Sequence, residues 1–425
     1  MSLDKRIFKG SWWLPSAPNE KLNGELIVEP NGKIQLELYS TFQWQVSGIS
    51  FEDRDYSAIL GRCYAPNSHM VDISLFNCHS SIKLNLSSDY PISSYNCRYA
   101  LIGIHTDSMD NQLFNKAYVG FEVLTYWNPP KRVRLISAEQ SIVVLIDKSL
   151  LNDTLASVNV DDDLTLNIDQ SYSYRHDFQE FYVRQTTRLE LIKDKMCAKQ
   201  VLYNTFKFEQ FLSFATLSPI EHSSIILYSK EKCQIFDDGE RYFHPIELIT
   251  CLYRYEKTQE INPSEFLFKF DDIASKFGNI YKKYYTNKDI VLIWSNMIDS
   301  LEKKQYYTSN DFLVVAQALD GYSFRFRKES GYLQQLIELR DEFRDITKVS
   351  LTEDELKRTR ASRDYFTHIL KLDEKRKRNA LDGVALYELT KKLRILLICC
   401  ILDFLGIDKE QINNMLNKSN SRFLR

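Results

Sequence analysis

A chain of 425 residues is too long for one typical hydrophobic core, so we expect two domains, with room for a small third unit. Its hydrophobic fraction of 44% is enough for full-sized cores. Its formal net charge of −2 excludes the global basic excess of many proteins that bind nucleic acid or acidic membranes. A surface for such a partner must therefore be local.

The first part of the chain has the pattern of antiparallel strands. Apolar and polar residues alternate on both sides of the turn sequence Pro30-Asn31-Gly32, which predicts a β-hairpin. Further strand-like runs follow at residues 70–76, 81–86, 99–105, 117–127, 141–147, 163–168 and 187–193. Because polar breaks separate these runs, residues 1–197 predict an antiparallel β-rich domain, either a sandwich or barrel-like.

The pattern changes near residue 198. Residues 199–218 space their apolar side chains as a helix does, and Pro219 ends that pattern. Two strand-like runs, 223–229 and 242–250, then flank the turn residues 237–239. Residues 198–265 therefore predict a mixed α/β segment attached to the β-rich domain.

The remaining residues, 266–425, have a helical period almost throughout. The predicted helices are 264–285, 287–304, 309–321, 330–348, 352–371 and 384–405. The chain is therefore expected to be α+β, an antiparallel β-rich part followed by an all-α helical bundle.

The ends of the last two helices carry capping signals. Ser350 and Thr352 each have a glutamate three residues later, as a capping box requires. Asp382 is expected to cap the last helix at its start, and Gly406 to close it.

The eight cysteines are widely spaced apart from the pair Cys399-Cys400, and no secretory signal follows the start of the chain. We therefore expect reduced thiols in a cytoplasmic protein. The most apolar stretch, 395–407, is too short for a membrane span and contains Asp403, so it predicts a buried helix and no membrane partner.

A zinc site is conceivable in the β-rich part, because cysteine and histidine are the usual zinc ligands. The candidate ligands are Cys63, His69, Cys78, His79, Cys97 and His105. Their spacings match no zinc finger or ribbon, and adjacent residues of a strand point to opposite faces. No metal is therefore assigned. The pair Trp12-Trp13 is expected in the core rather than in a ligand platform.

The most basic stretch is residues 356–379, with nine lysines or arginines against three acids. On a helix, Arg360, Asp364 and His368 follow one another at intervals of four residues, so their side chains lie one above another. Arg363 lies at the edge of the same face. One helix can therefore present guanidinium, carboxylate and imidazole groups to a single groove.

These groups suit RNA cleavage, because RNA carries its own nucleophile, the 2′-hydroxyl. An imidazole can transfer protons near neutral pH, and a guanidinium can stabilise the charge on phosphate oxygens. His368 and Arg363 are the candidates for these roles, and Asp364 can orient the His368 ring. This chemistry needs no metal ion or other cofactor.

The same pattern has a simpler interpretation, since an arginine five residues before a histidine occurs by chance and a basic stretch is usually a solvated helix face. If RNA does bind, the neighbouring cations are placed to hold its phosphates. They are Arg358, Arg360, Lys371, Lys375, Arg376, Lys377 and Arg378.

The chain resembles the HEPN superfamily of helical nucleotide-binding domains. Its ribonuclease members carry an arginine, a polar residue, three further residues and a histidine, and "RDYFTH" (363–368) fits this pattern. More specifically, the chain resembles ApeA-type HEPN proteins. The ordered segments that carry this resemblance are "KGSWWLP" (9–15), "NGELIVEPNGKIQLELYS" (23–40), "FEQFLSFATLSPI" (208–220) and "DFLVVAQALDGYSFR" (311–325).

The resemblance implies a ribonuclease of anti-phage defence that acts by abortive infection on RNA, with tRNA as one candidate. It also implies a homodimer in which two motif helices share one cleft, and a β-rich domain that senses a phage-derived trigger. Arg363 and His368 are then catalytic. Asp364 stands where the family usually has asparagine, and Asp320 where similar proteins often have glutamate.

Two alternatives compete with catalysis. The helical domain can be a non-catalytic dimerisation module whose β-rich domain recognises a phage component. It can also be a toxin silenced by modification of a tyrosine two residues after the histidine. That position is Leu370 here, which argues against the second alternative.

Overall fold

A computed structural model describes fourteen stretches of the chain. They are residues 4–42, 55–66, 69–80, 92–129, 133–138, 141–146, 154–161, 163–176, 181–236, 239–251, 261–301, 308–327, 331–367 and 379–424. Over these residues, no helix is both long and apolar enough to cross a membrane.

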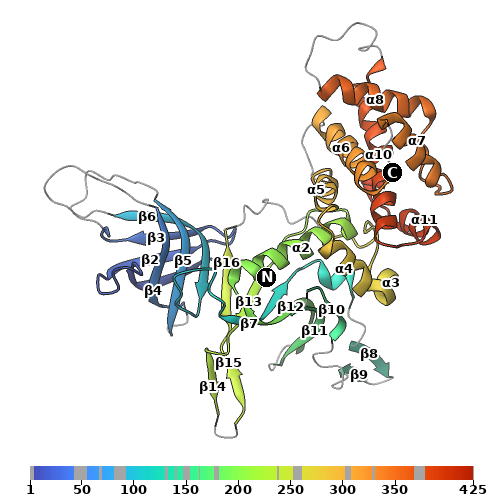
Figure 1. Ribbon diagram of the computed structural model, residues 1–425. Coiled ribbons are helices and arrows are strands. Elements are labelled where there is room, and N and C mark those ends of the chain that lie inside the picture. The colour runs from blue at the N-terminus through green and yellow to red at the C-terminus, as the bar shows by residue number, and fades with distance from the viewer. Residues whose placement is uncertain are drawn as a thin grey trace, which may run out of the picture.

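The N-terminal strands form a closed antiparallel barrel (Figure 1). They are β1 (Arg6–Trp13), β2 (Leu22–Val28), β3 (Ile34–Leu38), β4 (Tyr56–Tyr64), β5 (Met70–Ser80) and β6 (Ser93–Ile102). Their order is β6-β3-β2-β1-β4-β5, and β5 also pairs with β6, which closes the barrel. The predicted hairpin is confirmed, with Val28 opposite Ile34 on β2 and β3. Trp12 and Trp13 are buried, as expected.

A second sheet continues from the barrel, because β16 pairs with β6. Its strands are β7 (Phe114–Gly120), β10 (Thr154–Asn159), β11 (Thr165–His176), β12 (Phe181–Met196), β13 (Ser224–Tyr228) and β16 (Ile246–Thr250). Together with the barrel they make one twelve-stranded array. Two hairpins stand apart from it: β8 (Val133–Ala138) with β9 (Ser141–Ile146), and β14 (Cys233–Ile235) with β15 (Arg241–Phe243).

Some strand predictions differ from the structure. The run 117–127 is strand only as far as Gly120, because Leu124 and Trp127 bury their side chains from a short helix, α1 (Leu124–Trp127). The run 81–86 and the turn residues 237 and 238 lie outside the described residues.

The helix predicted from residue 199 is confirmed as α2 (Ala198–Thr216). The bundle that follows contains α3 (Phe270–Ile273), η2 (Ala274–Lys276), α4 (Phe277–Thr286), α5 (Val291–Asp299), α6 (Ser309–Phe326), α7 (Tyr332–Glu342), α8 (Glu353–Thr367), α10 (Gly383–Phe404), α11 (Lys409–Lys418) and η3 (Arg422–Leu424). The predicted α+β class is confirmed. The domain limits at 197 and 265 stay a prediction.

The predicted single helix 264–285 is wrong. The backbone N–H groups of Leu267 and Phe268 donate to the carbonyl of Ala215 at the end of α2, so they are not available to a helix of their own. The helical residues begin only at Phe270, and the segments α3, η2 and α4 replace one long helix. Helix α11 was not predicted.

Helix α2 packs between the second sheet and the helical bundle. In Figure 1 it lies between strands β7 and β12 on one side and helices α4 and α5 on the other. The Trp127 Nε1–H donates to the Phe268 carbonyl at 3.0 Å, and the Trp294 Nε1–H donates to the Gln210 carbonyl at 3.0 Å. One continuous hydrophobic core therefore joins the second sheet to the helices.

Candidate active site

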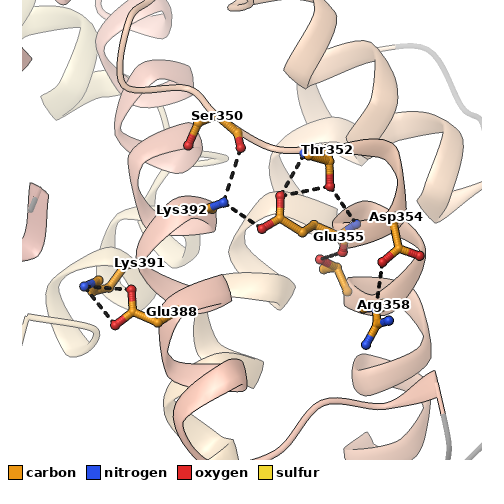
Figure 2. Close-up of polar contacts among 9 residues, drawn as sticks. Ser350, Thr352, Asp354, Glu355, Arg358, Glu388, Lys391 and Lys392 are labelled. Carbon is orange, nitrogen blue, oxygen red and sulfur yellow. Dashed lines mark hydrogen bonds and ion pairs between the residues drawn. The ribbon is translucent and has the colours of Figure 1, made fainter.

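Helix α8 carries the start of the basic stretch, and its N-terminus is fixed by a capping box (Figure 2). The Thr352 Oγ1 accepts from the Glu355 backbone N–H at 3.2 Å, while the Glu355 carboxylate accepts from the Thr352 backbone N–H at 2.8 Å. The Glu355 Oε1 also accepts from Lys392 Nζ on α10 at 2.6 Å. Both local capping and a contact between helices therefore hold α8 in place.

The capping box predicted at Ser350 is wrong. Helix α8 begins at Glu353 with Thr352 before it, and Glu353 pairs with Lys357 at 2.8 Å. Asp382 stands at the N-cap of α10 as predicted, but its side chain makes no capping hydrogen bond there. Gly406, with a φ of +86°, closes α10 as predicted.

One face of α8 is buried against the bundle through Leu356, Thr359 and Ser362, which are spaced three residues apart. The Ser362 Oγ accepts from the Leu381 backbone N–H at 2.9 Å. This bond fixes Leu381 beside Ser362, the residue that precedes Arg363 on α8.

Arg363 is held by groups from three helices. Its Nη2 donates to Asp320 Oδ2 of α6 at 2.7 Å, and its Nη1 donates to Asp364 Oδ1 at 3.1 Å. Its guanidinium carbon lies 4.4 Å from the ring centroid of Tyr332 on α7. The side chain is 29% exposed, so it is oriented by the protein and still reaches solvent.

The protonation states at this site follow from its contacts. Burial lowers the pKa of Arg363, but the hydrogen bonds to Asp364 and Asp320 raise it, and the net pKa lies above the ordinary value. Burial raises the pKa of Tyr332, whose hydroxyl donates to the Ala316 carbonyl at 3.4 Å. A fixed cation therefore rests on a neutral aromatic ring.

The other described cations of α8 are also paired. Arg360 Nε lies 3.9 Å from Asp364 Oδ2, which confirms the predicted alignment of these residues on one face. Arg358 Nε donates to Asp354 Oδ2 at 2.7 Å, one turn earlier (Figure 2). Asp364 thus lies between Arg360 and Arg363.

The structure brings together Arg363, Asp364, Arg360 and Arg358 on one helix, with Asp320 and Tyr332 beside Arg363. The remaining candidates lie outside the described residues; they are His368, Lys371, Lys375, Arg376, Lys377 and Arg378.

Comparison with family models shows which protein family this chain belongs to. Residues 7–284 match the family model for ApeA N-terminal domain 1, and residues 313–411 match the one for Apea-like HEPN. The chain belongs to the ApeA family. The resemblance expected from the sequence is therefore confirmed. No curated protein and no solved structure matches the chain.

The two matches assign the parts of this ApeA-family protein. The barrel, the second sheet and α2 fall in ApeA N-terminal domain 1, while Asp320, Tyr332 and Arg363 all fall in the HEPN domain. HEPN domains are generally ribonucleases and typically dimerise, and these two domains together indicate an anti-phage protein.

Tyr332 is the contact of Arg363 that sequence reasoning missed. No pattern marks it, because it is the first residue of α7 and its ring reaches Arg363 only through the packing of α7 on α8. Asp320 was noted only through the family resemblance. The available signal was an acid on α6, two helices before the motif helix α8.

The zinc alternative has no support from the geometry. Among the residues that the structure describes, no group of three or more His, Cys, Asp or Glu side chains is placed to hold a metal ion. Cys63, Cys78 and Cys97 are buried in the barrel. His79 and His105 instead contact Asp55 and the Gly61 carbonyl, at 2.8 Å each.

Proposed function

We propose that this ApeA-family protein is an endoribonuclease of anti-phage defence that cleaves host or phage RNA without a metal ion. The observation that carries the proposal is the arrangement of Arg363 on the HEPN motif helix. Asp320, Asp364 and the Tyr332 ring hold its guanidinium in one orientation at the protein surface. Such a group can stabilise a phosphate whose charge grows during cleavage.

The reaction follows from the chemistry of RNA. A base removes the proton of the 2′-hydroxyl, whose oxygen attacks the adjacent phosphorus while the bond to the 5′-oxygen breaks. The leaving 5′-oxygen takes up a proton, and a 2′,3′-cyclic phosphate remains. In this proposal His368 transfers a proton and Arg363 stabilises the charged phosphorane.

Two carboxylates beside one guanidinium leave the site without a net positive charge, so phosphate must compete with Asp320 and Asp364 for Arg363. This supports a weakly active resting state. The basic residues from Lys371 to Arg378 then supply the attraction for RNA, with Arg358 and Arg360 on α8. We further propose that residues 1–197, with the attached segment 198–265, sense a phage-derived trigger.

The test is cleavage of tRNA or total RNA by the purified protein in excess EDTA. Arg363→Ala and His368→Ala should each lower the cleavage rate at least a hundredfold, because each removes a group needed in the transition state. Arg344→Ala, which removes an exposed arginine paired with its neighbour Asp345, is the matched control and should cleave as the wild type does.

Cleavage that persists unchanged in His368→Ala, or that requires Mg²⁺, would contradict the proposal. Full protection against phage by both variants, with no cleavage by any form, would instead favour the non-catalytic binding module.

A further inference from the structure

Lys207 on α2 is a buried cation that lacks a counter-charge among the described residues. Only 7% of its surface is exposed. Within the part of the chain that the structure describes, no carboxylate pairs with its ammonium, and burial alone lowers its pKa. Lys116 on β7, a half-buried lysine in the same domain, is paired with a carboxylate, as buried lysines usually are, since its Nζ lies 2.7 Å from Glu190 Oε1.

The surroundings of this ammonium are aromatic. Its Nζ lies 5.4 Å from the ring centroid of Tyr284 on α4 and 5.8 Å from that of Tyr203, one turn earlier on α2. The faces of these rings partly replace the missing anion. The replacement is incomplete, because a ring quadrupole stabilises a desolvated ammonium less than a full negative charge does.

The same helix face carries two rings open to solvent. Tyr203 and Phe206 are each 53% exposed. Phe206 and Lys207 follow Tyr203 by three and four residues, so each of them is a neighbour of Tyr203 on the surface of α2. Tyr203 also contacts the ring of Tyr285 at 6.4 Å, edge to face. The exposed ring of Tyr203 thus lies beside the Lys207 ammonium.

Helix α4 also contacts the part of α2 that contains Tyr203 and Lys207. The Tyr284 hydroxyl donates to the Lys207 carbonyl at 3.0 Å, and the Tyr285 hydroxyl donates to Asn204 Oδ1 at 2.7 Å. These bonds hold α2 and α4 in register around the ammonium. Its position is therefore built by two elements rather than left to a flexible surface side chain.

We propose that Lys207, Tyr203 and Phe206 form a binding site for a small ligand that joins a phosphate to a flat ring, which is the chemistry of a nucleotide. The phosphate pairs with the Lys207 ammonium, and the flat ring stacks on the exposed rings of Tyr203 and Phe206. The site lies outside the HEPN match, and the binding of a mononucleotide does not depend on RNA cleavage.

The test is isothermal titration of the full chain with AMP, GMP, CMP and UMP, and with adenosine and inorganic phosphate as the two half-ligands. At least one mononucleotide should bind at least tenfold more tightly than either adenosine or phosphate. Lys207→Met keeps the apolar stem but removes the charge, and should weaken nucleotide binding at least tenfold. Lys199→Met is the matched control, since Lys199 is an exposed lysine of α2 paired with Asp110, and should bind as the wild type does.

A second variant and a second readout separate binding from folding. Tyr203→Ala should weaken nucleotide binding but leave the binding of phosphate unchanged. Without ligand, Lys207→Met should unfold at the wild-type temperature or above, because it removes an unpaired buried charge.

Four results would overturn the site. Three concern binding: the absence of saturable nucleotide binding, equal binding by Lys207→Met and the wild type, and equal affinity for phosphate and for every nucleotide. The fourth is a lower unfolding temperature for Lys207→Met, because the ammonium would then be satisfied by the rings alone.

Discussion

At the scale of single residues, the environment of Arg363 decides what it can do. A guanidinium on an exposed helix face would sample many rotamers, whereas here two carboxylates and a ring fix one orientation. Fixing a charged group before substrate arrives removes part of the cost of organising it during the reaction. The same carboxylates oppose phosphate, so orientation and attraction act in opposite directions.

Substitution of Asp320 separates the orientation of Arg363 from its attraction for phosphate. Asp320→Asn should lower kcat about tenfold, because the guanidinium loses its shortest ion pair and about 1.4 kcal/mol of transition-state stabilisation. KM should not rise, since a carboxylate that repels RNA is gone. Asp320→Glu should restore most of kcat. These constants are measured on a defined RNA, and an unchanged kcat for Asp320→Asn would show that Asp320 does not position Arg363.

At the scale of elements, α8 depends on α10 as well as on its own cap. Burial raises the pKa of Glu355, but hydrogen bonds from Lys392 and from Thr352 lower it, and the net pKa is below the ordinary value. A carboxylate with a lowered folded-state pKa stabilises the protein above its unfolded-state pKa, and this contribution is lost as pH falls through the folded-state value. The contact between α8 and α10 should therefore weaken in acid.

Lys392→Met tests this contact. At pH 7 it should lower the free energy of unfolding by about 1 kcal/mol, because the carboxylate loses a charged partner. Below about pH 4 the difference from the wild type should shrink, because protonated Glu355 no longer attracts Lys392. Lys391→Met is the control, since Lys391 pairs with Glu388 within α10 (Figure 2). Denaturant unfolding at several pH values measures the free energy of unfolding of both variants. A difference between Lys392→Met and the wild type that does not change with pH would contradict a role for the Glu355 charge.

At the scale of the whole molecule, the shared core places the HEPN bundle at one end of the twelve-stranded array. The barrel and the β14–β15 hairpin lie away from α8 (Figure 1). Under the proposal that the β-rich part senses a trigger, the second sheet and α2 are the elements that connect the barrel to the bundle. Val384 at the start of α10 is 78% exposed, and Leu381, three residues before it, contacts Ser362 on α8.

This geometry gives a prediction about assembly. The wild type should be a dimer by light scattering at micromolar concentration. Val384→Glu should give monomers and lower RNA cleavage at least tenfold, because a charge would be buried in the interface. Tyr242→Glu, a similar change on the exposed hairpin far from α8, should leave both unchanged. A fully active wild-type monomer would contradict the shared cleft.

Local pattern was enough where neighbouring residues make the structure. The hairpin around Pro30-Asn31-Gly32, helix α2 and the Thr352 capping box follow from alternation, helical period and capping within a few residues, and each was predicted. The order of the family segments and the position of Arg363 on a helix were also readable from the sequence alone.

Tertiary structure decided what depends on distant contacts. The closure of the barrel by β5 and β6, the break before Phe270, and the meeting of Asp320 and Tyr332 at Arg363 have no local signal, because each is set by packing between separate elements. The environment of Lys207 is of the same kind. A sequence shows that a lysine is present, but only the fold shows that this residue is buried beside two aromatic rings and that no carboxylate of the described residues pairs with it.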